Sequence, residues 1–172
     1  MDPEKNDIPN KLFTLVMIMR NNKLLLGMKK RGFGKGRWNG FGGKVQEGER
    51  LLDAAKRSNL PRETLEECCL HIKDPKHLAK IIFEFKGETQ LLEVHLFICE
   101  NFEGTPTETE EMQPRWFDLD KIPYDDMWPD DIFWYPLLFK KQHFEAYFLF
   151  EGHNIILEKN IREVSGQEKC PT

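Results

Sequence analysis

The chain of 172 residues has no apolar run near the roughly 20 residues that a membrane-spanning helix needs. Its charge is not strongly biased to one sign, since 25 Lys and Arg stand against 29 Asp and Glu, for a net charge of −4. Because long nucleic acid is bound by clustered positive charge, we expect neither a membrane nor long nucleic acid as a partner. Internal repeats and low-complexity segments are also absent from the sequence.

Cysteine is scarce, and its spacing suits neither a metal centre nor a disulfide framework. The four cysteines are Cys68, Cys69, Cys99 and Cys170. Such thiols suit a reducing compartment, and the polar start Met1–Asn10 lacks the apolar core of a signal peptide. We therefore expect an intracellular protein, cytoplasmic, with the nucleus and the mitochondrion as alternatives.

Length and composition predict one domain. A chain with 40% hydrophobic and 31% charged residues is ordinary for a globular protein of this size. No linker divides the sequence, so we expect one domain at residues 12–164 and flexible tails at residues 1–11 and 165–172.

Strand patterns dominate the sequence. The apolar run Leu12–Met19 predicts a buried strand, and Lys23–Met28 predicts the second arm of a hairpin. Further strands are expected at residues 37–41, 80–85, 91–99, 115–119, 144–150 and 154–163, with loops at 103–114 and 120–131. Helices are expected in the glutamate-rich region after Leu51 and at Asp131–Lys141. Strands arranged around two helices indicate an α+β fold.

One stretch combines a glycine turn with clustered carboxylates. The pair Gly42-Gly43 lets backbone approach a ligand, and Glu63, Glu66 and Glu67 follow at a spacing that a helix places on one face. A solvated helix face is the alternative interpretation. Hard divalent cations, however, prefer carboxylate oxygens together with backbone carbonyls. With the glycine turn just upstream, the pattern indicates a magnesium site for phosphate chemistry.

A basic, glycine-rich loop, Lys29–Arg37, precedes this stretch. A flexible surface loop is the alternative, but five cations beside a metal site favour contact with polyphosphate. Lys29 is the candidate substrate ligand within it. The five histidines are scattered without ligand spacing, so we expect each to be a surface or core residue.

The glycine–glutamate stretch resembles the signature of the Nudix hydrolase family, Gly-x5-Glu-x7-Arg-Glu-ψ-x-Glu-Glu-x-Gly-ψ. Gly43 and Glu49 fit its start, and residues 62–67 fit its Arg-Glu-x-x-Glu-Glu core. Outside the signature, residues 27–49 and 126–131 are similar to the MutT-homologue branch, which hydrolyses oxidised purine nucleoside triphosphates. The similar stretches also include Ile82–Phe85, Gly104–Pro106 and Glu111-Met112, and together they span about residues 12–164.

The resemblance implies a mixed β-sheet sandwiched between two α-helices in a monomer. It implies Mg²⁺-dependent hydrolysis of modified purine nucleoside triphosphates, such as 8-oxo-dGTP and 2-hydroxy-dATP, to monophosphate and pyrophosphate, which sanitises the nucleotide pool. The implied catalytic residues are Glu67, Glu63 and Arg62, with Glu67 as the general base. The implied magnesium ligands are the Gly42 carbonyl and the carboxylates of Glu63, Glu66, Glu67 and Glu111.

Base recognition is implied at a second set of residues. These are Thr14, Phe33, Asn39, Phe83, Trp128, Asp130 and Asp131. Trp128 offers a stacking face for a purine. Burial and mutual repulsion would leave one of Asp130 and Asp131 protonated. Moving the proton from one carboxyl to the other would suit purines whose edges carry different hydrogen-bond donors and acceptors. Without the resemblance, the aspartate pair is typical of a helix N-cap and an acidic first turn.

Two counts of the signature disagree by five residues. Counting forward from Gly43 makes Arg57 the signature arginine, whereas counting back from the last glutamates gives Arg62. A five-residue insertion therefore lies within residues 57–62. We predict a helix of a turn or two at Leu51–Lys56, then a bulged loop, and then a second helix with Pro61 in its first turn.

A second departure is Cys69, which stands where the signature has a glycine. Glycine at a helix end often supplies a positive φ, which cysteine adopts less readily. Because the insertion at residues 58–62 bears on the aim of the glutamates, a catalytically impaired nucleotide-binding Nudix protein is one alternative to the hydrolase. A Nudix enzyme acting on another nucleoside diphosphate derivative is a second alternative.

Overall fold

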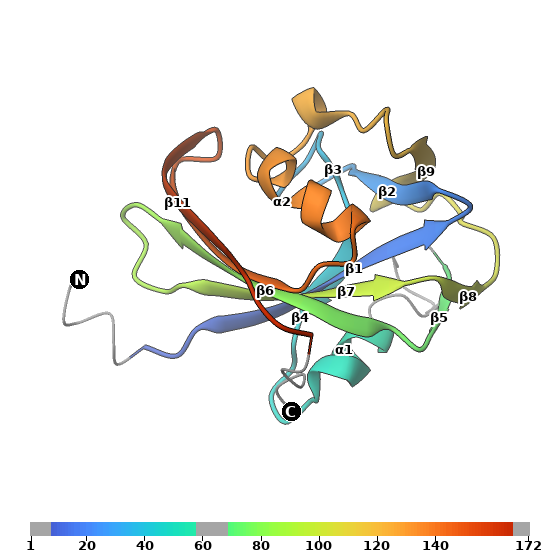
Figure 1. The fold of residues 1–172 in the computed structure, drawn as a ribbon, viewed down its shortest axis with the longest axis horizontal. Coiled ribbons are helices and arrows are strands. Elements are labelled where there is room, and N and C mark those ends of the chain that lie inside the picture. Colours follow the sequence, from blue (N-terminus) through green and yellow to red (C-terminus); the bar gives the residue numbers. More distant parts are fainter. Residues whose placement is uncertain (1–7, 58–68, 167–172) are drawn as a thin grey trace.

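A mixed β-sheet with helices on both faces forms the centre of the molecule (Figure 1). The computed structural model describes residues 8–57 and 69–166. The strands of the nine-stranded sheet are β1 (Lys11–Arg20), β2 (Lys23–Lys29), β3 (Trp38–Asn39), β4 (Phe41–Lys44), β6 (Lys76–Phe85), β7 (Leu92–Cys99), β9 (Met112–Asp118), β10 (Phe144–Glu151) and β11 (Ile155–Glu163). A smaller sheet pairs β5 (His71–Lys73) with β8 (Asn101–Glu103).

The strand order in the large sheet is β11-β10-β6-β7-β1-β2-β3, with β4 paired to β1 and β9 paired to β2. The pairs β1–β7 and β6–β10 are parallel, and the other pairs are antiparallel. Helix α1 (Leu51–Arg57) lies on one face and α2 (Asp131–Phe139) on the other, and a short 3-10 helix, η2 (Tyr124–Asp126), precedes α2. The predicted α+β fold, a mixed sheet between two helices, is confirmed.

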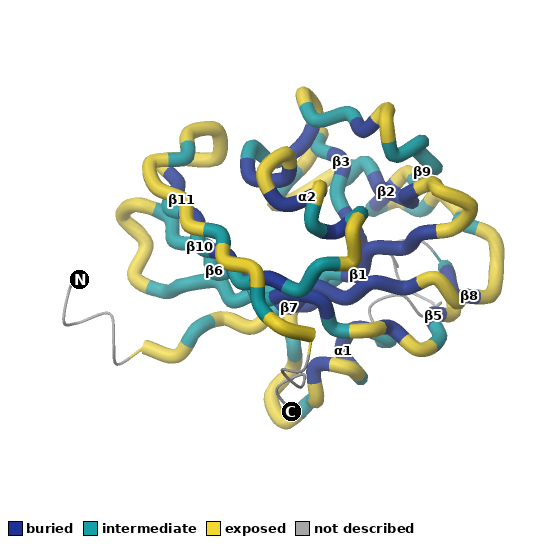
Figure 2. Tube along the Cα trace, viewed as in Figure 1, coloured by how far each residue is buried: buried dark blue, intermediate teal, exposed yellow. Residues whose placement is uncertain are grey.

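Strand β1 supplies both halves of the core because side chains alternate across a strand. Val16 and Ile18 belong to the apolar cluster on the α1 side, whereas Met17 and Met19 belong to the cluster on the α2 side. The middle of the sheet is correspondingly the most buried part of the chain (Figure 2). The predicted buried hairpin of β1 and β2 is thus confirmed.

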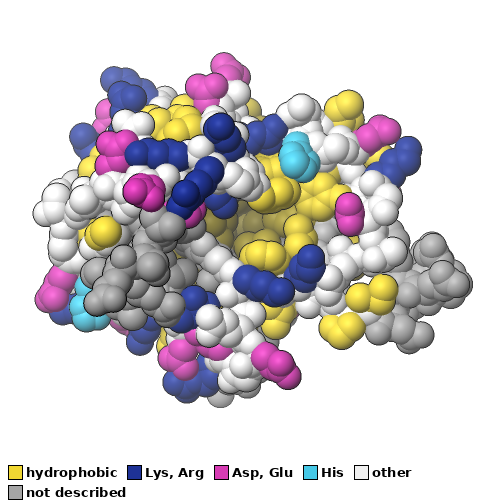
Figure 3. All heavy atoms as spheres, turned by 180° about the vertical axis from the view of Figure 1, so that it is seen from behind, with side chains coloured by type: hydrophobic (Ala, Val, Ile, Leu, Met, Phe, Trp, Pro, Cys, Tyr) yellow, Lys and Arg dark blue, Asp and Glu magenta, His cyan; other side chains and the backbone are white. Residues whose placement is uncertain are grey.

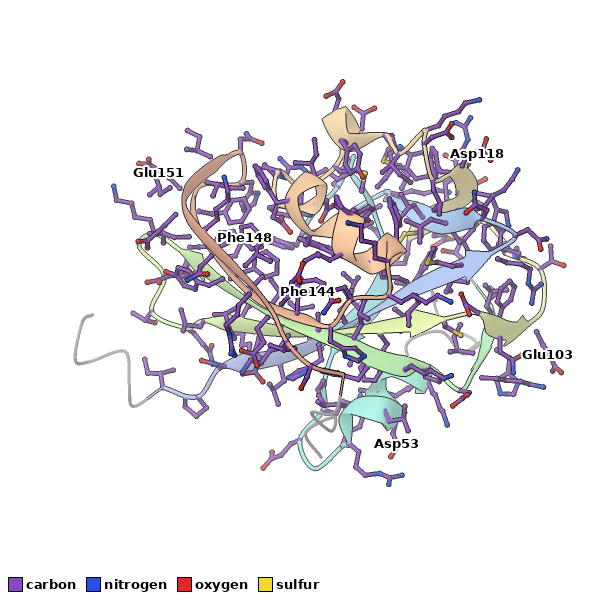
Figure 4. All side chains as sticks on the ribbon, viewed as in Figure 1. Asp53, Glu103, Asp118, Phe144, Phe148 and Glu151 are labelled. Atoms are coloured by element: carbon purple, nitrogen blue, oxygen red, sulfur yellow. The ribbon has the colours of Figure 1, made fainter. Side chains whose placement is uncertain are left out.

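Aromatic side chains of β10 fill the space under α2. Phe144 and Phe148 point from the sheet toward this helix (Figure 4), and both are buried. Trp134 packs on Phe144 with ring centroids 6.1 Å apart. The cluster at residues 144–150 is therefore core, as the sequence predicted.

Several boundaries differ from the sequence-based expectation. Helix α2 ends at Phe139, two residues before its predicted end, because Lys141 adopts a left-handed φ of +53° that an α-helix cannot continue. Strand β6 begins at Lys76 rather than at residue 80, and β5 and β8 were not expected. Strand β9 includes Pro114 from a predicted loop, and β2 is the only neighbour of β9 among the described strands, which makes a proline tolerable.

Helix α1 occupies residues 51–57, where the first helical segment was predicted at residues 51–56. The predicted bulged loop and the helix starting near Pro61 lie outside the described residues. Most of the two predicted tails, residues 1–11 and 165–172, also lies outside them, and β1 already begins at Lys11.

Candidate active site

The glycine turn lies in β4, pressed against β1. Gly42 pairs with Leu15, and a Cβ atom at Gly42 would lie 1.8 Å from the carbonyl oxygen of Thr14. That distance is far inside van der Waals contact, so only glycine lets the two strands pair here. At Gly43, in contrast, an added Cβ would meet nothing within 4 Å. The structure thus requires glycine at Gly42 for strand pairing, and the predicted approach of this backbone to a ligand stays a prediction.

An arginine ties α1 to the segment that follows the glycine turn. Arg57 donates from Nε to Glu49 Oε2 at 2.7 Å and from Nη2 to Glu49 Oε1 at 3.0 Å. Its Nη2 also donates to the carbonyl oxygen of Lys44 at 3.0 Å. Both side chains are mostly buried, and the two-point geometry is the strong form of an arginine–carboxylate pair. Arg57 therefore fixes where α1 sits relative to β4.

Glu111 faces a cation from the basic loop. Arg31 donates to Glu111 Oε1 from Nε at 3.0 Å and from Nη2 at 2.7 Å. The neighbouring Lys30 donates its backbone N–H to the Glu111 carbonyl oxygen at 2.9 Å, and its ammonium group pairs with Glu108. The loop therefore holds Glu111 through both its main chain and its side chain.

Gly42 and Glu111 approach the same part of the molecule. Their chain neighbours, Phe41 and Met112, both belong to the α1-side core. A Cβ at Gly27 would lie 2.0 Å from the Met112 sulfur and 2.9 Å from the Phe41 ring, which shows that both side chains meet there. A backbone carbonyl and a carboxylate are the kinds of donor that a hard divalent cation prefers.

The other predicted metal ligands lie outside the described residues, as does Arg62. They are Glu63, Glu66 and Glu67. Within residues 8–57 and 69–166, no three His, Cys, Asp or Glu side chains gather in an arrangement that would hold a metal ion. Gly42 and Glu111 are thus the part of the predicted ligand set that the structure describes, and the roles of all five residues stay predictions.

The aspartate pair at the start of α2 is almost fully buried. Asp130 is 2% exposed and Asp131 is 3% exposed. Asp130 occupies the N-cap position but makes no side-chain cap hydrogen bond. Its Oδ2 instead accepts a hydrogen bond from Trp134 Nε1 at 2.8 Å. Asp130 at the N-cap and Asp131 in the first turn are the positions that the alternative interpretation predicts, but the Asp130 carboxylate bonds Trp134 and caps no amide of α2.

Burial sets the protonation of this pair. Desolvation raises the pKa of Asp130 to about 6, against hydrogen bonds and the positive charge of Arg37, which lower it. Desolvation and the neighbouring Asp130 together raise the pKa of Asp131 well above its usual range. Of the two carboxyls, Asp131 is therefore the one that keeps its proton more readily. One carboxyl that donates beside one that accepts stays a prediction.

Aromatic rings gather near the aspartate pair. Phe33 stacks on Trp128 with ring centroids 5.0 Å apart, and the His153 ring lies 5.1 Å from Phe33 and 5.2 Å from Trp128. Phe85 meets Phe33 edge-on at 6.2 Å. On the face shown in Figure 3, apolar side chains line a hollow with basic side chains and a histidine at its rim. Phe33 is 57% exposed, so the cluster opens to solvent.

Three other predicted site residues lie in different parts of the fold. Asn39 follows Trp38, which bridges to Met127 in parallel, so Asn39 and Trp128 run side by side. Phe83 stacks on Phe148 at 5.9 Å in the α2-side core. Lys29 anchors the basic loop, because its carbonyl oxygen accepts a hydrogen bond from Gly36 N–H at 2.9 Å. The substrate contacts of all these residues stay predictions.

Thr14 stands apart from this group. The alternation of β1 places its side chain with Val16 on the α1 side of the sheet, whereas Leu15 packs on the α2 side with Phe83 and Trp128. The structure therefore does not bring the Thr14 side chain to the aromatic cluster, and Leu15 is the β1 residue that faces it. Buried Oδ2 of Asp131 and the Tyr135 hydroxyl have no hydrogen-bond partner among the described residues, which suits a bound polar ligand.

Another hollow, of about 360 Å³, lies at the turn between β1 and β2. It is lined by residues such as Asn21, Asn22 and Lys141, and Lys141 is paired there with Glu100 at 2.6 Å. None of its lining residues is a predicted site residue. We therefore place the chemistry at the aspartate and glycine segments rather than here.

Similar proteins identify the family of this chain. The NUDIX domain profile matches residues 11–138. The oxidized purine nucleoside triphosphate hydrolase of Danio rerio is 52% identical over 155 residues, which cover 90% of this chain and 96% of that protein. The protein of the same name from Mus musculus is 51% identical over the same shares. The chain belongs to the Nudix family.

The fold of this Nudix chain is also found among solved structures. A MutT protein from Bacillus halodurans superposes with a TM-score of 0.73 at 18% identity, covering 88% of this chain and 97% of that one. At such identity the likeness concerns the fold alone. It agrees with the mixed sheet and the two helices described above.

Two Nudix signature positions gain a structural account. Arg57, reached by counting forward from Gly43, is the arginine that holds Glu49. Cys69, which replaces the signature glycine, adopts a φ of +59°, so the left-handed conformation is kept without the glycine. A side chain in this region costs about 1–2 kcal/mol. The backbone path is therefore conserved at Cys69 at some expense in stability.

Sequence reasoning missed three residues around the site of this Nudix domain. Arg31 pairs with Glu111, Arg37 contacts Trp128, and His153 joins the aromatic cluster. Arg31 and Arg37 were seen only as members of a basic loop, and His153 only as an isolated histidine. No spacing pattern signals them, because the partners are distant along the chain: Glu111 lies 80 residues after Arg31, and Trp128 lies 25 residues before His153.

In the described residues, no helix is long and apolar enough to cross a membrane.

Proposed function

We propose that this chain hydrolyses oxidised purine nucleoside triphosphates to the monophosphate and pyrophosphate, and so removes them from the nucleotide pool. The observation that carries the proposal is the 52% identity to a protein named oxidized purine nucleoside triphosphate hydrolase, across 96% of that protein. The buried aspartate pair beside an aromatic cluster supports it, because a purine needs both a stacking surface and polar groups for its edge.

The proposed cofactor is a divalent cation, Mg²⁺ in particular. Its ligands would be the Gly42 carbonyl and Glu111, together with Glu63, Glu66 and Glu67. When bound, such a cation neutralises charge that develops on phosphate oxygens and lowers the pKa of a coordinated water. In this proposal the Glu67 carboxylate takes the proton of the attacking water, Glu63 and Arg62 assist it, and Lys29 contacts the phosphates.

Recognition of the base follows from the protonation states of the aspartate pair. Asp130, with its pKa near 6, accepts a hydrogen bond, whereas the protonated Asp131 donates one. The purine stacks against Trp128, beside Phe33, Asn39 and Phe83. Because the two carboxyls share one proton, the pair suits edges that present either a donor or an acceptor.

Pyrophosphate release tests this function. The full chain is incubated with Mg²⁺ and 8-oxo-dGTP, 2-hydroxy-dATP, dGTP or dATP in parallel. We expect pyrophosphate and nucleoside monophosphate from the modified nucleotides, with a higher kcat/KM than for dGTP and dATP. A preference for unmodified dGTP, or no pyrophosphate from any of the four, would contradict the proposal.

The metal ligand set makes a separate prediction with a matched control. Glu111→Gln should weaken Mn²⁺ binding, followed by electron paramagnetic resonance, by at least about ten-fold. Glu110→Gln changes the same charge at the adjacent, exposed position and should leave the affinity unchanged. Equal affinities in the two variants would remove Glu111 from the ligand set.

A second candidate is a nucleotide-binding Nudix protein with impaired catalysis. The five-residue difference between the two counts of the signature favours it, because an insertion at residues 58–62 would alter the aim of the glutamates. In that case deleting residues 58–62 should raise kcat at least ten-fold without changing the affinity for the monophosphate. An unchanged kcat after the deletion would exclude impairment by the insertion.

The substrate panel also covers a third candidate, a Nudix enzyme for another nucleoside diphosphate derivative. Adding a dinucleotide and a nucleoside diphosphate sugar to the four triphosphates distinguishes this candidate, since one of these two would then be the better substrate.

We further propose that the chain is a monomer in the cytoplasm. Light scattering of the purified chain at working concentration tests the monomeric state.

A further inference from the structure

Arg37 joins three segments that are distant in sequence. Its guanidinium carbon lies 4.3 Å from the centre of the Trp128 ring. From the same group, Nη1 donates to the carbonyl oxygen of His153 at 3.0 Å, and Nη2 donates to Asn154 Oδ1. One side chain thus connects the end of the basic loop, the segment before α2 and the turn between β10 and β11.

The backbone of the loop presents Arg37 in this position. Lys29 receives a hydrogen bond on its carbonyl oxygen from Gly36, and Arg37 N–H donates to the Gly34 carbonyl oxygen at 3.1 Å. Gly34 and Gly36 both have positive φ values, of +83° and +82°, so the tight path depends on glycine. The loop is therefore closed on itself, and its end is held beside Trp128.

The Trp128 ring is thereby contacted by side chains from the other two segments. Phe33 stacks on it at 5.0 Å, and the His153 ring approaches at 5.2 Å with a tilt of 56°. Trp128 precedes Asp130 by two residues and is only partly buried. Any movement of this ring would change the space between the stacking surface and the buried carboxyls.

Charge links Arg37 to the carboxyls as well. Against the dominant effect of desolvation, its positive charge lowers the pKa of Asp130 and of Asp131. The other groups that bear on this pair are the Trp134 N–H, which donates to Asp130, and the phenols of Tyr124 and Tyr135, whose pKa values burial raises. Arg37 is thus the cation acting on the pair among the described residues.

We infer that Arg37 is a positioning and specificity-determining residue of the purine pocket, which clamps Trp128 to the β10–β11 turn so that a stacked base meets Asp130 and Asp131 in register. This inference rests on the proposed function, since it assigns a role within the same site. The planar guanidinium stacks on an aromatic ring and donates in a fork at once, which a lysine ammonium group cannot do.

Three variants separate the clamp from the charge. Arg37→Lys keeps the charge but loses the planar fork, Arg37→Gln loses both, and Lys121→Gln removes an exposed cation outside the loop as a control. Binding of 8-oxo-dGMP is measured by calorimetry from pH 5 to 8, and KM and kcat for 8-oxo-dGTP are measured beside it. The monophosphate reports on the pocket without turnover.

We expect Arg37→Lys to weaken 8-oxo-dGMP binding about three- to ten-fold, with the pH midpoint of binding unchanged. Arg37→Gln should weaken it at least as much and move the pH midpoint upward, because the cation that lowers the carboxyl pKa values is gone. In both variants KM should rise more than kcat falls. Lys121→Gln should bind as the wild-type chain does.

The hydrogen-bond partner provides an independent check. Asn154→Ala should cost part of the affinity, and combining it with Arg37→Gln should cost no more than Arg37→Gln alone, because both changes break one contact. Fully additive losses would overturn the clamp. So would wild-type affinity in both Arg37 variants, or a loss of affinity that is the same for unmodified dGMP.

Failure of the inference is distinguishable from failure of the proposed function. If the wild-type chain releases pyrophosphate from 8-oxo-dGTP and the Arg37 variants keep its KM, the inference alone fails. If the wild-type chain binds 8-oxo-dGMP in an Arg37-dependent way without releasing pyrophosphate, the hydrolase proposal alone fails. If it binds no 8-oxo-dGMP at all, both fail.

Discussion

At the scale of single residues, two adjacent glycines have different reasons to be glycine. At Gly42 a Cβ would lie 1.8 Å from the Thr14 carbonyl oxygen, which belongs to backbone that cannot yield without separating β1 from β4. At Gly43 the same atom would meet nothing within 4 Å, and its φ is not in the left-handed region. The sequence motif Gly-Gly hides this difference.

Gly42→Ala should therefore lower the free energy of unfolding by about 1–3 kcal/mol, the cost of forcing extra atoms into packed structure. Gly43→Ala should be neutral or stabilising by up to about 1 kcal/mol, because alanine loses less entropy on folding. Urea denaturation of the two variants measures both values. Equal effects would mean that β1 and β4 do not approach as described.

The buried Asp130 makes a second prediction at this scale. Its pKa in the folded state is raised to about 6, above its ordinary 3.8. Between pH 3.8 and about 6, Asp130 is ionised in the unfolded chain but protonated in the folded chain. The contribution of Asp130 to stability is therefore full below pH 3.8 and is lost as pH rises to about 6. Ionised Asp130 is thus a stability cost at neutral pH.

Asp130→Asn should remove that cost and stabilise the protein at pH 7.5 by roughly 1–3 kcal/mol, while it weakens purine recognition. The new amide still accepts from Trp134. Asp118→Asn is the control, since Asp118 is an exposed surface partner of Lys23 and should shift stability by no more than about 0.5 kcal/mol. A destabilised Asp130→Asn variant at pH 7.5 would show that the carboxylate is better accommodated than its burial suggests.

At the scale of elements, β6 and β7 are joined by a chain of polar side chains. His95 Nε2 contacts Glu93 Oε2 at 2.8 Å, and His95 Nδ1 contacts His77 Nε2 at 2.9 Å. His95 is only 1% exposed. Burial, followed by the charges of His95, His143 and Lys80, lowers the pKa of His77 to about 4. The two strands thus depend on a neutral histidine.

Because the pKa of His77 falls from 6.5 to about 4 on folding, its contribution is present above pH 6.5 and is lost as pH falls toward 4. His77 is partly exposed, so solvent screening limits the effect to the order of 1 kcal/mol. His77→Gln should remove this rise of the unfolding free energy with pH, so that only the fall caused by Asp130 remains in this window. His71→Gln, at an exposed position on β5, should keep the wild-type sensitivity.

The elements themselves were largely predictable. The near-continuous apolar run of strand length in β1 identified that strand, and the run at residues 144–150 did the same for β10. The misses have local causes. Strands β5 and β8 have three residues each, too few for a periodic signal, and Pro114 hid the start of β9 until its edge position was known.

At the scale of the whole molecule, the two buried titrations oppose one another. Rising pH between about 4 and 6 costs stability through Asp130 and adds stability through His77. The two sites lie on opposite sides of the sheet, since Asp130 is at α2 and His77 contacts Phe97 of the α1-side core. Their effects on stability should therefore add.

The wild-type unfolding free energy should accordingly change little between pH 4 and 6.5, because the two slopes cancel in part. The unfolding free energy of the Asp130→Asn variant should rise with pH across this window, whereas that of the His77→Gln variant should fall. Urea denaturation at four pH values compares the three proteins. Parallel curves for the two variants would show that neither group controls stability in this range.

The sequence by itself determined the family, the sheet between two helices and the kinds of residue that the chemistry needs. It did so because apolar periodicity and a long, specific motif are local properties of a chain. The glycine turn, Glu111 and the aspartate pair were all identifiable in this way. The predicted glutamates at residues 63–67 rest on the same motif.

Only the tertiary structure decided how those residues act. Burial raised the pKa values of Asp130 and Asp131 at the start of α2, and folding brought Arg37 onto Trp128 and His77 onto His95. Strand alternation turned Thr14 to the α1 side. Desolvation and contacts between distant segments depend on where the whole chain runs, and no local pattern encodes them.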